Sequence, residues 1–135
     1  MEDKLISSEK IQETIKALNA AENQLSSNGV EKTMVSIDKL MTHDVEGWAN
    51  GEHRPDRETE RKFDRILLTD IPDYRREIGR IIIDPPYAAF SWQITGTSKS
   101  TRKRLNVLGS SQAEFSADGK IRKYWVYVDT AQMPF

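Results

Sequence analysis

The sequence contains no cysteine and only two histidines, and each shortage removes a class of chemistry. Without cysteine there is no disulfide framework and no thiolate nucleophile. Two histidines without spacing to a third ligand do not predict a zinc site. The default expectation is therefore a protein that depends little on metals or cofactors.

Strong net charge and long apolar runs are also absent. The 20 basic and 21 acidic residues give a formal net charge of −1, so charge alone attracts neither nucleic acid nor an anionic membrane. No apolar run approaches the ~18 residues of a membrane-spanning helix. The polar start, Met1-Glu2-Asp3-Lys4, lacks the apolar core of a signal peptide. We therefore expect a cytoplasmic protein with no nucleic-acid or membrane partner.

What the sequence does contain is enough apolar material for one packed core. Hydrophobic residues make up 37% of the 135 residues and aromatic residues 8%. A chain of this length buries about two-thirds of its unfolded surface on folding. We expect a single domain over residues 1–135, with residues 1–8 flexible.

Helical periodicity dominates the first half of the chain. Apolar residues recur at three- and four-residue spacing in three segments, and capping or stop residues flank these segments. The predictions are a helix from Ser7-Ser8 to a stop at Asn28-Gly29, a helix from Val30 to about His43, a short strand over 44–50, a polar loop over 51–55, and a helix from the N-cap Asp56 to Pro72-Asp73.

From Tyr74 onward the apolar period changes to two, which predicts a sheet. Asp118-Gly119 is a dipeptide that closes tight hairpins. Tyr124 to Val128 is apolar on both faces, which indicates burial on both sides or a bulge. The fold class is therefore α+β, with antiparallel strands over 75–83, 87–96, 105–116 and 120–129.

Asp129 is the first candidate for chemistry, because it ends the most aromatic strand. If it shares the apolar environment of that strand, desolvation would raise its pKa and fit it for proton transfer near neutral pH. The alternative is an ordinary polar residue where a strand meets solvent, which is more common because most aspartates are exposed.

Four further polar residues are candidates. His43 beside Asp44 could act as an oriented base, or His43 could interact with a helix dipole. Glu46 shares strand parity with Trp48 and could be a second buried acid, although glutamate is rarely buried without a partner. Asp73 follows a helix-ending proline, which suits a turn or the mouth of a pocket.

Aromatic residues on the predicted strands could form the walls of a pocket for a flat substrate. The alternative is that they fill a core without a ligand. An inward-facing tyrosine of the last strand could donate a hydrogen bond to a developing enolate, although buried tyrosines usually keep the hydroxyl at the surface. The expected lining is Trp48, Phe90, Trp92, Trp125 and either Tyr124 or Tyr127.

The order of these elements carries three motifs, namely Ile71-Pro72-Asp73, the run from Trp92 to Thr97, and Gly119-Lys120-Ile121 followed by Trp125 and Asp129. In this order, residues 10 to 130 resemble the SnoaL-like polyketide cyclases, within the superfamily of nuclear transport factor two and ketosteroid isomerase. The resemblance implies a cone-shaped, curved antiparallel sheet, or α+β barrel, closed by three N-terminal helices around an apolar pocket.

The resemblance also implies a function. Family members use no metal or organic cofactor, commonly form homodimers through the sheet, and often transfer protons with the carboxylate that corresponds to Asp129. It implies cyclisation, isomerisation or dehydration, as a lyase or isomerase, of a hydrophobic polyketide- or terpenoid-like substrate in natural product biosynthesis. The alternative is a non-catalytic ligand-binding or protein-assembly domain with the same fold.

The sequence differs from these families in two places, and the differences bear on the substrate and on the type of reaction. The connection over 98–105 is shorter and more basic than is usual in the cyclases, which leaves the substrate open. The related limonene-epoxide hydrolases have an aspartate where Val126 stands, and Arg80 and Asp84 are wrongly spaced for their Arg-x-Asp pair. Epoxide hydrolysis is therefore disfavoured.

Overall fold

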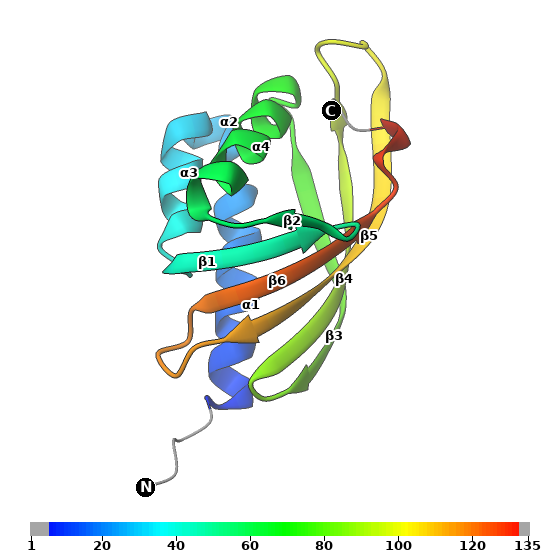
Figure 1. The fold of residues 1–135 in the computed structure, drawn as a ribbon. Helices are drawn as coiled ribbons and strands as arrows, with labels where there is room; N and C mark the ends of the chain where they lie inside the picture. Colours follow the sequence, from blue (N-terminus) through cyan, green and yellow to red (C-terminus); the bar gives the residue numbers. More distant parts are fainter. Residues whose placement is uncertain (1–5, 133–135) are drawn as a thin grey trace, which may run out of the picture.

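A curved six-stranded sheet with helices against one face forms the structure, which is a computed structural model that describes residues 6–132 (Figure 1). The uncovered face of the sheet is called the outer face below. The elements are α1 (Ser8–Glu22), α2 (Leu25–Asn28), α3 (Val30–Asp38), β1 (Met41–Ala49), β2 (Glu52–Arg54), α4 (Arg57–Asp70), β3 (Arg75–Asp84), β4 (Tyr87–Thr97), β5 (Arg104–Phe115), β6 (Ile121–Val128) and a final 3-10 turn, η1 (Thr130–Gln132).

The strands lie in the order β2-β1-β6-β5-β4-β3. The predicted α+β class, the curved sheet and the N-terminal helices are confirmed. The sheet is open, however, and it is not wholly antiparallel, because β1 pairs in parallel with β6. The chain between these two strands crosses over through α4 and then runs back and forth as β3, β4 and β5.

The first predicted helix is divided in two at Asn23. Its side chain donates to the carbonyl of Arg76 on β3 and accepts from the amide of the same residue, both at 2.7 Å. These two bonds tie the end of α1 to an edge strand and end the helix. The predicted start is confirmed, since Ser7 Oγ caps α1 by accepting from the Lys10 amide at 3.2 Å.

The second helix is shorter than predicted and ends at Asp38 rather than near His43. Met41 instead begins β1 by pairing with Ile121. Arg57 stabilises this change of direction, because its Nη2 atom donates to the backbone carbonyls of Asp38, Met41 and Thr42 at 3.3, 2.9 and 2.8 Å.

The predicted polar loop over 51–55 contains strand β2, which pairs with β1 in a hairpin. Asn50 and Gly51 both have positive φ, at 49° and 84°. Asn-Gly with this geometry is the common two-residue hairpin connection. The N-cap of the following helix is as predicted, with Asp56 Oδ1 accepting from the Thr59 amide at 2.8 Å.

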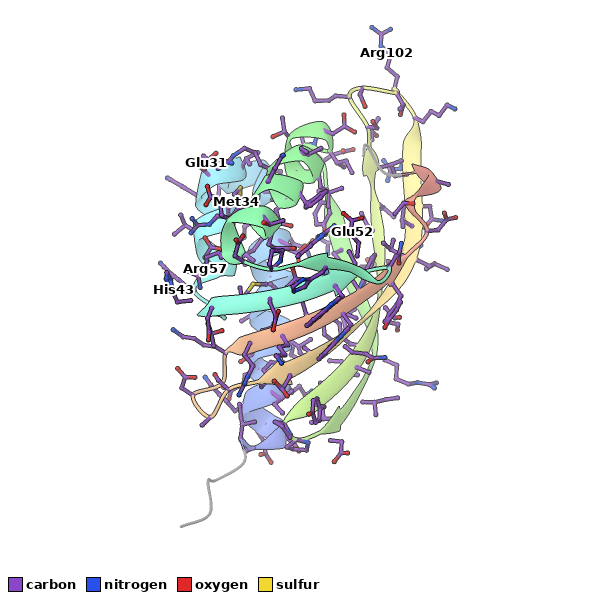
Figure 2. All side chains as sticks on the ribbon, in the orientation of Figure 1. Glu31, Met34, His43, Glu52, Arg57 and Arg102 are labelled. Atoms are coloured by element: carbon purple, nitrogen blue, oxygen red, sulfur yellow. The ribbon has the colours of Figure 1, made fainter. Side chains whose placement is uncertain are left out.

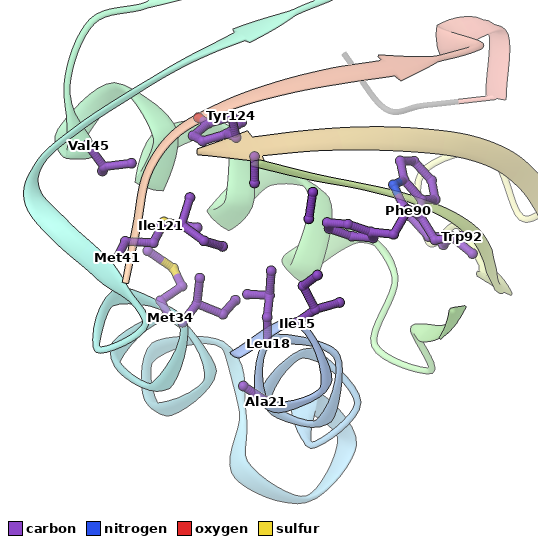
Figure 3. Packing of buried hydrophobic residues seen from close by; sticks show 14 of the residues in the cluster. Ile15, Leu18, Ala21, Met34, Met41, Val45, Phe90, Trp92, Ile121 and Tyr124 are labelled. Atoms are coloured by element: carbon purple, nitrogen blue, oxygen red, sulfur yellow. The ribbon is translucent and has the colours of Figure 1, made fainter. Parts of the chain in front are cut away.

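The inner face of the sheet packs on the helices and forms the core (Figure 3). The predicted apolar face of β4, which includes Phe90 and Trp92, is buried there. Ile15 and Leu18 of α1 pack opposite these rings, in line with the helical period of that segment. No helix in residues 6–132 is long and apolar enough to cross a membrane.

Two glycines on the inner face leave room for aromatic rings from neighbouring strands. A Cβ atom at Gly47 of β1 would lie 2.1 Å from Cζ of Tyr124 on β6. At Gly109 of β5, a Cβ atom would lie 2.3 Å from Cη2 of Trp92 on β4. Each ring therefore lies over the backbone of the strand beside it.

We expect Gly47→Ala to destabilise the protein by about 1–3 kcal/mol, because the added methyl overlaps the Tyr124 ring. Urea unfolding measures the effect, and the exposed change Ser110→Ala is the control. In a Tyr124→Ala background the same glycine substitution should cost much less. An equal cost in both backgrounds would show that backbone conformation, rather than the ring, requires glycine.

Candidate functional site

A cavity of about 500 Å³ lies between the inner face of the sheet and the helices. Its walls come mainly from α1, α4 and the inner faces of β4 and β6, and they are largely apolar. Cavities of this size hold small organic molecules. The ionisable side chains of the cavity form two paired groups and one unpaired acid in the interior, while a further acid, Glu52, lies at the exposed rim.

The first paired group consists of Arg54, Glu60 and Tyr124. Arg54 Nη1 lies 3.1 Å from Glu60 Oε2, and its guanidinium carbon lies 4.1 Å from the centre of the Phe63 ring. The Tyr124 hydroxyl donates to the same Glu60 oxygen. Burial, followed by the Glu60 charge, raises the pKa of Tyr124, so the phenol stays protonated.

The second paired group consists of Arg76, Glu22 and Tyr74. Arg76 Nη2 lies 2.8 Å from one oxygen of Glu22, and the Tyr74 hydroxyl donates to the other at 2.8 Å. Asn19 also accepts from Arg76 Nε at 3.0 Å. Burial, followed by the Glu22 charge, raises the pKa of Tyr74 well above its ordinary value. This group joins α1 to β3, and its ionic groups compensate each other.

The unpaired acid is Asp64, which lies one helical turn after Glu60 on α4 and lines the cavity. Within residues 6–132 its carboxyl has no hydrogen bond and no ion-pair partner. Burial is the main cause that raises its pKa well above the usual range, and the nearby charges of Glu60 and Glu22 raise it further. A carboxyl in this environment exchanges its proton at higher pH than an exposed one, which suits a general acid or base.

The four acids and bases predicted to be catalytic do not line the cavity. Asp129 is exposed just after β6, and its Oδ1 accepts from the Ala131 amide at 3.0 Å in the turn that follows. The shared apolar environment on which its predicted role depends is therefore absent. The catalytic role itself stays a prediction.

The other three of these residues are on β1, away from the cavity. Glu46 lies on the outer face, with one oxygen 2.9 Å from His53 Nε2 and the other 3.8 Å from Lys123 Nζ. His43 and Asp44 are exposed near the start of the strand (Figure 2). Glu46 and Trp48 share one face of the strand, as their parity predicts, but this is the outer face, because Gly47 between them faces the interior. Of the two alternatives for Glu46, the structure therefore has the one in which it is not a buried acid.

The predicted aromatic lining is divided between the two faces of the sheet. Phe90, Trp92 and Tyr124 line the cavity. Trp48 and Trp125 do not, because their strands present them to the outer face, where the two rings stack with centres 5.4 Å apart.

Tyr124 is the inward-facing tyrosine of β6, whereas Tyr127 is 47% exposed. Asp73 also lies outside the cavity, where its Oδ1 accepts from the Thr97 amide at 2.7 Å and so joins the start of β3 to the end of β4. That hydrogen bond is the main cause that lowers the pKa of Asp73. The substrate-binding roles of these residues remain predictions.

The six charged residues that line the cavity were not among the sequence candidates. A signal for two of them exists in α4, where Glu60 and Asp64 share a helical stripe with the apolar residues Phe63 and Leu67. Ionisable residues inside an apolar stripe indicate burial or function. Arg54 and Arg76 carry no comparable local signal. Among residues 6–132, no group of three or more His, Asp or Glu side chains could hold a metal ion.

Comparison with known proteins gives matches in structure alone. No family model matches the sequence, and no curated protein is a significant sequence match. AclR from Streptomyces galilaeus, described as a candidate hydroxylase, is similar with a TM-score of 0.80 and 17% identity over 93% of this chain and 92% of the other.

Two further solved structures have the same arrangement. A protein from Jannaschia sp. CCS1, described as a candidate SnoaL-like polyketide cyclase, has a TM-score of 0.78 and 13% identity over 98% of this chain and 94% of its own. An NTF2-like protein of unknown function from Exiguobacterium sp. 255-15 has a TM-score of 0.74 and 18% identity over 86% and 98%. The chain thus has the cone-shaped α+β fold of the SnoaL-like and NTF2-like proteins, as the sequence resemblance implies.

Proposed function

We propose that this protein is a cofactor-independent enzyme that performs acid–base chemistry on a hydrophobic small molecule, with Asp64 as the group that transfers the proton. One observation carries the proposal, namely an unpaired carboxyl in a largely apolar cavity of about 500 Å³. The names of the structural neighbours, a hydroxylase and a polyketide cyclase, support a small-molecule reaction but belong to those proteins.

The surroundings of Asp64 favour a mechanism with one acid–base group. The hydroxyl protons of Tyr124 and Tyr74 are already donated to Glu60 and Glu22, and the Trp92 Nε1 proton is donated to Ser111 at 2.9 Å. Asp64 would take a proton from a carbon beside a carbonyl. Returning it to another carbon gives isomerisation. If the resulting enolate instead attacks a second carbonyl carbon of the same molecule, Asp64 returns the proton to the alkoxide oxygen that forms, which completes an aldol-type cyclisation. Giving the proton to a departing hydroxyl gives dehydration and water.

The alternative is a non-catalytic domain that binds a ligand in the same cavity. An apolar cavity by itself fits both functions. The raised pKa of Asp64 favours the enzyme, because perturbed carboxyls are concentrated at catalytic sites. The two functions differ in whether bound molecules undergo proton transfer.

A probe that needs only a base can test Asp64 without knowledge of the substrate. In 5-nitrobenzisoxazole, a base removes the proton on carbon, the N–O bond breaks, and a coloured phenolate forms. We expect turnover whose kcat/KM rises with pH as Asp64 ionises. Asp64→Asn should lower kcat/KM by about 10²-fold or more, because the amide cannot accept the proton.

Two variants complete this absorbance assay. Glu58→Gln removes an exposed carboxyl from the same helix and should leave the rate unchanged. Asp129→Asn tests the prediction from the resemblance, which places the base there. Activity that survives Asp64→Asn but is lost in Asp129→Asn would refute the proposed role of Asp64.

The pH dependence of stability gives a second test. The raised pKa means that the folded protein holds a proton on Asp64 at pH values where the unfolded chain has released it. The contribution of Asp64 to the free energy of unfolding therefore becomes less favourable as pH rises from about 4 through the pKa of the folded state. We expect Asp64→Asn to match the wild type near pH 3.5 and to be more stable at pH 7.5. The gain is roughly 1.4 kcal/mol for each unit by which the folded pKa exceeds the unfolded one.

Urea unfolding at the two pH values measures this difference, with Glu58→Gln as the control. An Asp64→Asn variant that is less stable than the wild type at pH 7.5 would show that the carboxylate makes a stabilising contact in the folded protein.

We also infer that the outer face of the sheet joins two copies of the chain. The paired positions Ile82, Ala89, Gln112, Trp125 and Trp48 form a row across five strands of this face. Ile82 is 60% exposed, and Leu108 on the same face is 70% exposed. Exposed apolar side chains gathered on one face are typical of a protein interface.

Replacing both Ile82 and Leu108 by glutamate should weaken this dimer by at least about tenfold, because like charges would be desolvated in the contact. Sedimentation equilibrium measures the association. Val35→Glu, on the exposed surface of α3, is the control and should leave association unchanged. A wild-type protein that stays monomeric at high concentration would contradict the inference.

A further inference from the structure

The cavity wall contains more carboxyl groups than cationic groups. Glu22, Glu52, Glu60 and Asp64 line it, together with two guanidinium groups from Arg54 and Arg76. No lysine or histidine among residues 6–132 takes part in the lining. Each arginine forms its ion pair with a glutamate, so Asp64 and Glu52 have no ion-pair contact in that part of the chain. Burial has the largest effect on the pKa of Asp64 and raises it, while the nearby Arg54 charge lowers it by less.

The two unpaired carboxyls occupy different depths. Asp64 lies on α4 beside the aromatic and aliphatic wall formed by Phe63 and Leu67. Glu52 is an exposed residue of β2 (Figure 2). Because it also lines the cavity, the cavity meets solvent there. A ligand that enters past Glu52 therefore meets one carboxyl group at the rim and a second one, Asp64, in the interior.

The two arginines are poorly placed to receive an anionic ligand. Glu60 is bound by both Arg54 and Tyr124, and Glu22 by both Arg76 and Tyr74. Within residues 6–132, Arg54 Nε and Arg76 Nη2 have no hydrogen-bond acceptor, although Nη2 lies in ion-pair contact with Glu22, and both atoms are buried. A carboxylate or phosphate ligand would therefore have to displace one of these glutamates and leave it unpaired in the interior. Leaving a buried charge unpaired is strongly unfavourable, so anionic ligands are selected against.

We propose that the cavity selects ligands with a protonated amine on an apolar body, with the ammonium group on Asp64 and the body against Phe90 and Trp92. This inference rests on the proposed site and names the chemical class of a ligand that binds there. While its ammonium group is paired with Asp64, that carboxyl is not free to take a proton from carbon, so ligand selection and catalysis are separate uses of the same group and are tested separately. A cation supplies the charge partner that Asp64 lacks, and their attraction is strong because the cavity is poorly solvated. Binding of the cation also favours the ionised form of Asp64.

Three probes with one apolar body test the inference, namely 2-naphthylmethylamine, 2-naphthalenemethanol and 2-naphthoate. Isothermal titration calorimetry at pH 7.5 measures each dissociation constant for the wild type, Asp64→Asn and the exposed control Glu58→Gln. We expect the amine to bind at least about tenfold tighter than the alcohol, and the carboxylate to bind weakest. Asp64→Asn should remove the preference for the amine and leave binding of the alcohol unchanged, whereas Glu58→Gln should keep the preference.

Naphthoate that binds as tightly as the amine would overturn the inference. So would an amine preference that survives Asp64→Asn, or a lack of binding by all three probes. The outcome is separable from the proposed catalysis. Amine selectivity without turnover of 5-nitrobenzisoxazole would refute the proposed catalysis but support the proposed ligand class. Turnover without amine selectivity would support the catalysis but refute the ligand class.

Discussion

Two largely buried arginine–glutamate pairs attach helices α1 and α4 to the sheet. Arg54 and Glu60 join β2 to α4, and Arg76 and Glu22 join β3 to α1. Removing one partner of a buried pair costs roughly 3–5 kcal/mol, since the other charge is left without compensation. Both ion pairs border the cavity. They engage both of its arginines, so no arginine of the cavity is left to pair with Asp64.

The inner face of the sheet depends on steric constraints as well as on charge. Gly47 and Gly109 allow the rings of Tyr124 and Trp92 to lie over the backbone of adjacent strands. The Tyr124 hydroxyl then reaches Glu60, which links the sheet to the pair formed with Arg54. The glycine at position 47 therefore influences the electrostatics of a site to which it contributes no side chain.

Local signals in the sequence predicted most elements of the fold. The Asp56 cap, the alternation of β4 and the hairpin before β6 each depend on residues a few positions apart. The parallel pairing of β1 with β6 depends on residues nearly 80 positions apart and has no local signal. The hairpin at Asn50-Gly51 does have a local signal, because Asn-Gly is a common hairpin dipeptide. The short polar strand after it was nevertheless predicted as a loop, because it lacks the apolar alternation that usually marks a strand.

The site was harder to predict because it depends on which way the strands face. Tyr124 to Val128 is apolar at every position, so its pattern does not show which residues point inward. Pairing with β1 places Tyr124 opposite Gly47 and Trp125 opposite Trp48, and this register sends both tryptophans to the outer face. The unpaired carboxyl in the interior of the cavity, Asp64, is on α4, whereas Asp129 at the end of the strand is exposed.

The isolation of Asp64 is most simply explained by function. Two glutamates of the same cavity, Glu22 and Glu60, are each compensated by an arginine and a tyrosine, so the chain does supply partners to acids that serve its structure. An aspartate in these surroundings without such a partner lowers stability at neutral pH. An asparagine or leucine there would avoid that cost, and functional sites are where proteins retain groups that cost stability. The partner that completes the charge on Asp64 is then a proton or a bound cation.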